Sequence, residues 1–150
     1  MFNIPKNYLP LNATVNPLVR PSDLNGAIEG GETTIYWFSS DNGASKSTTY
    51  SIKRYPTLDA AIVTYANKLD SDFKSYDLSL TLEKKIHADE HYTGCGVGKI
   101  TGRYRCVVLL RYEEFIVTIS SSTDISFGSQ NLKEIVYLYD EIFNQVVLSD

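Results

Sequence analysis

The chain has 150 residues, of which 43% are hydrophobic and 21% are charged, which is the size and composition of one globular domain. Fourteen Lys and Arg residues against eighteen Asp and Glu residues give a net charge of -4, which argues against a phosphate-binding surface for nucleic acid. The unbroken apolar run at residues 106–110 is far shorter than the roughly 20 residues of a membrane-spanning helix. We therefore expect a single domain that binds no nucleic acid and does not span a membrane.

The composition also bears on the cellular compartment. Tyr occurs 11 times, and there is one Met and two Cys; a hydroxyl-rich composition is common in exported proteins, and two cysteines permit one disulfide. Residues 1–5 contain no basic segment followed by an apolar stretch, so no signal peptide is expected there. Either the protein is cytoplasmic, or Met1 replaces a leader or lipid-anchored segment removed from upstream. We favour the second alternative and expect an extracytoplasmic protein, secreted or lipid-anchored.

The N-terminal part is rich in proline. Residues 1–32 contain four of the five prolines and end in Gly30 and Gly31. Proline at this density interrupts both helices and sheet ladders. We expect an irregular lead-in or tether over residues 1–32 and a single domain over residues 33–150.

A hairpin and a helix open the domain. Apolar and polar residues alternate from Thr33 to residue 38 and again around Tyr50, and the Asn42–Gly43 pair between them is a strong hairpin signal. Thr57 is the expected N-cap of the next helix. Its apolar stripe, at spacings of four, three and four, consists of Leu58, Ile62, Tyr65 and Leu69.

Four strands and a second helix follow. Alternation predicts strands over residues 78–86, 92–99, 103–112 and 115–121. Residues 122–130 are expected to form a loop, and Asn131 with Glu134 makes a capping box for the C-terminal helix. The apolar stripe of that helix consists of Leu132, Ile135, Tyr139, Ile142, Phe143 and Val146.

Side-chain parity fixes the register of two strand pairs. A two-residue turn at Glu113–Glu114 places Tyr112 opposite Phe115 and aligns further apolar pairs behind them. A turn at residues 100–101, or a four-residue loop over 99–102, places Cys95 opposite Cys106. We therefore expect these two cysteines to form a cross-strand disulfide in an oxidising compartment.

Both faces of the predicted sheet carry apolar residues, so each face needs a covering layer. The two amphipathic helices supply one layer for each face. The fold class is therefore α+β: an antiparallel sheet, made of an N-terminal hairpin and a four-strand meander, with a helix after the hairpin and a second helix at the C-terminus, in an α/β sandwich.

This order of elements resembles the PsbP-like superfamily, which includes photosystem II extrinsic subunits and many bacterial lipoproteins. The resemblance covers residues 33–148 and depends on element order, without a diagnostic motif. It implies an antiparallel α/β sandwich and, in most members, a non-catalytic binding or assembly role. It brings no functional residues to this chain.

Both histidines of the chain, His87 and His91, lie in one short segment. On a helix, this spacing would place the two histidines on one face, where they could ligate zinc with a carboxylate completing the set; Asp89 is the candidate carboxylate. The surroundings predict strand and turn instead. A two-residue turn at Asp89–Glu90 keeps Ile86 on the core side and sends the histidines to opposite faces, so we favour a solvated hairpin tip over a metal site.

The two predicted tips, Asp89–Glu90 and Glu113–Glu114, fall at the same end of a meander. Their carboxylates could attract a hard divalent cation such as calcium, although charged tips also protect a sheet edge from association. We favour the second interpretation and predict no cofactor.

A glycine-rich strand and neighbouring arginines form a further candidate ligand site. Close approach by a helix or by the lead-in segment is the simpler explanation of the glycines, because neither the P-loop nor the dinucleotide-binding spacing is met. The candidate ligand-binding residues are Gly94, Gly96, Gly98, Arg103 and Arg105.

The sequence thus predicts a non-catalytic extracytoplasmic module that binds an unknown protein or small molecule. The alternative is a small hydrolase-type enzyme that uses the segment from His87 to His91, or Cys95 as a nucleophile.

Overall fold

The computed structural model describes residues 14–15, 24–38, 45–73, 78–79, 81–97, 104–122 and 125–146. The strands are β1 (Thr14–Val15), β2 (Glu29–Phe38), β3 (Ser45–Arg54), β4 (Leu78–Ser79), β5 (Glu90–Val97), β6 (Tyr104–Tyr112) and β7 (Phe115–Ser122). The helices are α1 (Leu58–Lys68), which continues into a π-helical turn at Leu69–Phe73, and α2 (Ile125–Val146). Among these described residues no helix is both long and apolar enough to cross a bilayer.

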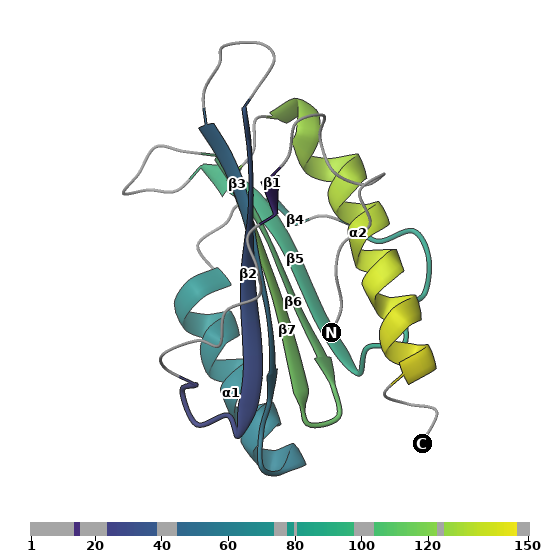
Figure 1. The fold of residues 1–150 in the computed structure, drawn as a ribbon. Helices are drawn as coiled ribbons and strands as arrows, with labels where there is room; N and C mark the ends of the chain where they lie inside the picture. The colour runs from purple at the N-terminus through teal and green to yellow at the C-terminus, as the bar shows by residue number, and fades with distance from the viewer. Residues whose placement is uncertain are drawn as a thin grey trace.

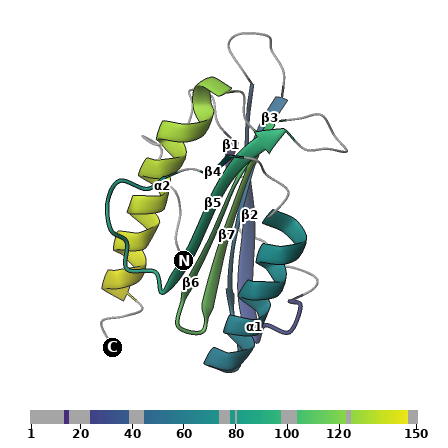
Figure 2. The same cartoon turned by 180° about the vertical axis from the view of Figure 1, so that it is seen from behind.

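The strands form one antiparallel sheet in the order β1-β2-β3-β7-β6-β5-β4. The hairpin β2–β3 pairs with β7, and β4 to β7 form the meander. Helix α2 covers one face of the sheet (Figure 1) and α1 covers the other, as the reverse view shows (Figure 2). The predicted α+β fold, with a hairpin, a meander and a helix on each face, is confirmed.

The core has two halves, one on each side of the sheet. Strand β6 contributes to both: Val108 and Leu110 face α2, whereas Val107 and Leu109 face α1. This double burial explains the unbroken apolar run in the sequence. The α2 half also contains Ile35, Tyr50, Ile86, Cys95, Cys106, Tyr112, Val117, Ile119, Leu132, Ile135, Val136, Tyr139 and Phe143. The α1 half also contains Ala27, Tyr55, Ala61, Tyr65 and Ile116.

Helix α1 begins where predicted but faces the sheet differently. The Thr57 hydroxyl accepts a hydrogen bond from the Ala60 N–H at 3.1 Å, which confirms the N-cap. The predicted stripe is wrong in two positions, because Leu58 and Ile62 are 46% and 39% exposed. The small side chain of Ala61 lies against the sheet instead. A small residue at the contact lets the helix approach closely, and this turns the larger aliphatic residues outward.

The body of the domain begins earlier than predicted. Strand β2 starts at Glu29 rather than at Thr33, and Leu24 and Ala27 pack against the α1 half of the core. Asn25 and Gly26 both have positive φ, 48° and 83°, in a turn closed by a 3.0 Å bond from the Ala27 N–H to the Leu24 carbonyl. Such a turn is typical of an Asn–Gly pair. The described residues before Thr33 are therefore part of the sheet and core, and the tether remains a prediction for the rest.

The predicted end of one strand, the turn after it and the start of the second helix are corrected, and two other predicted turns lie outside the described residues. Strand β4 ends at Ser79 instead of continuing to residue 86, and Leu78 pairs with Cys95, so the expected two-residue turn at Asp89–Glu90 is wrong. Helix α2 starts at Ile125, so the predicted loop and the cap at Asn131 are also wrong. Extending a helix that is anchored by packing needs little local propensity. The predicted turns at residues 39–44 and 98–103 are not among the described residues.

The two predicted registers are confirmed. Tyr112 pairs with Phe115 across the β6–β7 turn. Cys95 pairs with Cys106 and forms a disulfide with it, with the two Cα atoms 4.1 Å apart.

The disulfide gives a first prediction. Replacing both Cys95 and Cys106 by Ala should lower the free energy of unfolding by about 2–3 kcal/mol, because the bridge closes a short loop in the unfolded chain. Urea unfolding measures this change, and the native protein with reductant serves as the control that should match the variant. Intact mass after alkylation without reductant should show no alkylated cysteine. Two alkylated cysteines in the folded, oxidised protein would contradict the bridge.

The buried tyrosines give a second prediction, on alkaline stability. Burial is the main cause that raises the pKa of Tyr65 from 10.0 to about 12. Between pH 10 and pH 12 the unfolded phenol ionises while the folded one stays protonated, so the free energy of unfolding falls as the pH rises. Tyr65→Phe should reduce this fall, measured as urea midpoints at pH 8, 10, 11 and 12. Some loss should remain, since burial also raises the pKa of Tyr50 and Tyr55.

The matched control for this experiment is Tyr36→Phe, because Tyr36 is exposed on β2. This variant should lose stability with pH as the native protein does. An unchanged pH profile in Tyr65→Phe would contradict the prediction.

Candidate functional site

Between β4 and β5 the chain leaves the sheet and runs along α2. The Tyr137 hydroxyl on α2 accepts hydrogen bonds from the N–H groups of Glu83, at 2.9 Å, and Lys84, at 3.1 Å. These bonds replace the ladder bonds that a longer β4 would make with β5.

The Asp140 carboxylate on α2 holds the next part of this segment. It is 4% exposed and accepts from the His87 N–H at 2.8 Å and the Ala88 N–H at 3.1 Å. The His87 Nδ1 lies 2.8 Å from its Oδ2, and the Tyr112 hydroxyl donates to its Oδ1 at 2.9 Å. Burial, and then the negative charge of Asp140, raise the pKa of Tyr112. A buried carboxylate with this many donors is a stable anchor.

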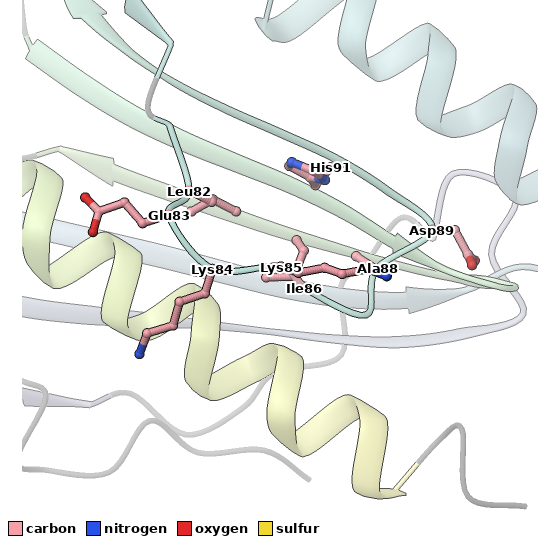
Figure 3. A pocket seen from close by; sticks show the side chains of 8 residues that line it. All are labelled: Leu82, Glu83, Lys84, Lys85, Ile86, Ala88, Asp89 and His91. Atoms are coloured by element: carbon pink, nitrogen blue, oxygen red, sulfur yellow. The ribbon is translucent and has the colours of Figure 1, made fainter.

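The segment of residues 82–89, which links β4 to β5, borders an open hollow of about 410 Å³ at the β4 edge of the sheet. The segment forms one side of it, and β5 forms the other at His91 (Figure 3). The lining residues are Leu82, Glu83, Lys84, Lys85, Ile86, Ala88, Asp89 and His91. Ile86 is buried, and Leu82 and Ala88 pack against the α2 half of the core. The hollow therefore combines an apolar base with a charged rim.

Most charged side chains on this rim already have an interaction partner. The Lys133 Nζ lies 2.8 Å from the Glu83 carboxylate and lowers the pKa of Glu83. The Lys84 Nζ lies 5.0 Å from the centre of the Tyr137 ring, a cation–π contact. Figure 3 shows Glu83 and Lys84 extending away from the His91 ring.

Two cationic or potentially cationic side chains of the rim differ from the others. In the part of the chain that the structure describes, the side chains of Lys85 and His91 have no hydrogen-bond or ion-pair partner. They stand on the two sides of the hollow, Lys85 on the segment and His91 on β5.

The acidic tips lie at the same end of the sheet, and arginines bind three of their four carboxylates. Arg111 is buried and donates to Asp89 at 3.0 Å and to Glu90 at 2.6 Å. Arg54 donates to Glu114 at 3.1 Å. Charge-assisted hydrogen bonds thus account for these three carboxylates.

The three candidate metal ligands are used separately. His87 bonds to Asp140, Asp89 bonds to Arg111, and His91 lines the hollow. Both histidines lie on the α2 side, not on opposite faces, because His91 shares the strand parity of Cys95. Among the described residues no group of three or more His, Cys, Asp or Glu side chains could hold a metal ion.

Three of the candidate ligand residues on β5 and β6 are described, and Gly96 lies directly opposite Arg105 in the β5–β6 ladder. A Cβ on Gly94 would lie 2.9 Å from the Tyr92 hydroxyl, so a tyrosine of the same strand lies close against this glycine. Gly96 is buried, and Arg105 donates to the Ser120 hydroxyl at 2.6 Å. Gly98 and Arg103 lie outside the described residues.

Sequence reasoning missed the anchors of this region, Tyr137 and Asp140, and the exposed Lys85. A signal for one of them was present, because Asp140 is an acidic residue directly beside the predicted apolar stripe of α2, one position after Tyr139. A charge at the border of a buried face is a candidate for a buried polar contact.

A third prediction concerns Asp140. Asp140→Ala leaves the N–H groups of His87 and Ala88 without their acceptor, so the free energy of unfolding should fall by about 3 kcal/mol. Amide exchange should become faster at these two residues than in the centre of β6. Glu141→Ala is the control, since Glu141 is exposed on the same helix and bonds to Gln145; it should change stability by less than about 0.5 kcal/mol. Unchanged exchange at His87 and Ala88 in Asp140→Ala would contradict the anchor.

Comparison with known proteins finds no family model, no curated protein and no solved structure that matches this chain. The resemblance to the PsbP-like superfamily thus remains a prediction from element order. The residues of the hollow and its anchors are the basis for a functional assignment.

Proposed function

We propose that this protein is a non-catalytic binding module that takes a small ligand, or the end of a partner chain, in the hollow between residues 82–89 and β5. The observation that carries the proposal is the rim of this hollow, where Lys85 and His91 stand beside an apolar base. Ligand sites typically combine an apolar lining with a few polar groups that orient the ligand, in volumes of about 300–1,000 Å³.

The construction of the hollow supports a binding role. Backbone N–H groups of its wall donate hydrogen bonds to the Tyr137 hydroxyl and the Asp140 carboxylate of α2. The hollow therefore exists before a ligand binds. A preformed site avoids the ordering cost of binding.

The use of the reactive side chains also supports a non-catalytic role. The Cys95 sulfur is bonded to Cys106, so it is no nucleophile in this state. The Asp140 carboxylate serves two backbone N–H groups and Tyr112 in addition to His87.

One observation favours the hydrolase alternative. The Asp140 carboxylate holds Nδ1 of His87, whose side chain is half exposed, and such a pair leaves Nε2 of the ring available as a general base. Replacing both His87 and His91 by Ala tests this alternative against any assayed hydrolase activity. Loss of that activity in a folded variant would overturn the non-catalytic proposal.

We further propose an extracytoplasmic location, of the kind found among PsbP-like bacterial lipoproteins. The disulfide between Cys95 and Cys106 supports it, because structural disulfides persist mainly in oxidising compartments.

A fourth prediction tests the binding role. A library of small neutral, anionic and cationic fragments at millimolar concentration should include binders whose amide shift changes, in ¹⁵N NMR spectra, concentrate at residues 82–91. Ala88→Leu should weaken these binders, since Ala88 lines the hollow and the added side chain occupies part of it. Ala66→Leu is the matched control, because Ala66 is exposed on α1, on the opposite side of the sheet. If no fragment binds at residues 82–91, or if Ala88→Leu leaves the affinity of the fragments unchanged as Ala66→Leu does, the proposal is contradicted.

A further inference from the structure

We infer that the ligand of the hollow is an anion joined to an apolar group, such as an aliphatic carboxylate, held between Lys85 and His91. This inference rests on the proposed binding function and adds the chemical class of the ligand.

The apolar part of the ligand follows from the base of the hollow. Leu82 and Ala88 are partly buried and pack against the α2 half of the core. Ile86, in the same segment, is buried. An aliphatic chain on this base removes apolar surface from water, which is the main non-directional contribution to affinity.

The sign of the charge follows from the partners of the rim residues. Both carboxylates of the lining are already bound by cations from other elements, Glu83 by Lys133 and Asp89 by Arg111. A cationic ligand would have to displace one of these partners. An anion needs no such displacement, because within the described residues Lys85 and His91 have side-chain donors without an acceptor.

The positions of these two donors suit a single anionic group. His91 is fixed by the β5–β6 ladder, where it pairs with Leu110. Lys85 lies between two tethered residues, since the N–H of Lys84 bonds to Tyr137 and that of His87 bonds to Asp140. Because the two backbones are held independently on the two sides of the hollow, they need no rearrangement when a carboxylate binds between the two side chains.

The experiment compares matched probes on the full chain. Hexanoate should bind at least about tenfold more tightly than hexanamide or hexylammonium, by NMR titration of residues 82–91 at low salt. Lys85→Met and His91→Leu each remove the donor, so each should weaken hexanoate by about tenfold and weaken hexanamide much less, the loss expected for one charge-assisted hydrogen bond. Lys68→Gln is the control, because Lys68 lies on α1, away from the hollow, and hexanoate affinity should not change. Circular dichroism confirms that each variant is folded.

A second pair of probes separates a free small molecule from a chain terminus. An acetylated leucine dipeptide is titrated with a free and with an amidated C-terminus, and preference for the free form supports a terminal carboxylate as the natural group. Preference for hexanoate without peptide binding supports a small-molecule carboxylate.

The experiment distinguishes failure of the anionic-ligand proposal from failure of the proposed binding function. If hexanamide or hexylammonium binds as well as hexanoate, or if both Lys85→Met and His91→Leu leave hexanoate affinity unchanged, the anionic ligand is wrong and the binding module stands. If neither these probes nor the fragment library bind at residues 82–91, the proposed function is wrong as well.

Discussion

The buried carboxylate of Asp140 holds the chain on α2 after β4 has ended. Its two oxygens accept the N–H groups of His87 and Ala88, shortly before β5 begins at Glu90. A charged acceptor outcompetes a neutral carbonyl for these donors, because charge-assisted hydrogen bonds are stronger. The segment therefore follows α2, and the hollow beside His91 exists because of that departure.

The parts of the fold that parity controls could be predicted from the sequence. A strand has a side-chain period of two, so the Glu113–Glu114 turn and the opposition of Cys95 and Cys106 followed from matching apolar pairs. The path of residues 81–89 could not be predicted in this way. It depends on Tyr137 and Asp140, more than 50 residues later in the chain. The alternating leucines at residues 78, 80 and 82 were equally compatible with a longer strand. The orientation of α1 failed for a related reason, since the choice between Ala61 and Ile62 depends on how closely the helix approaches the sheet.

The candidate site was predictable in some of its residues, whereas Lys85, the two anchors on α2 and the ion pairs were not. Asp89, His91 and the acidic tips were recognised as a charged cluster at one end of the sheet. The sequence does not show that Arg111 of β6 binds two of those carboxylates. Arg111 and Lys133 bind Asp89 and Glu83, the two carboxylates that line the hollow, and for this reason we propose an anion rather than a cation as its ligand. The net charge of the whole chain gives no indication of this, because it averages over the surface.

The disulfide lies far from the N-terminal end of the sheet order. Strands β1, β2 and β3 occupy one edge, whereas the bridged pair β5–β6 lies toward the other. A pull on the N-terminus, or a protease acting there, would peel the hairpin away strand by strand before it reached the covalent link. Helix α2 packs on Tyr50 of β3 as well as on Val108 and Leu110 of β6, so loss of the hairpin would remove one part of its contacts and leave the part over the bridged strands.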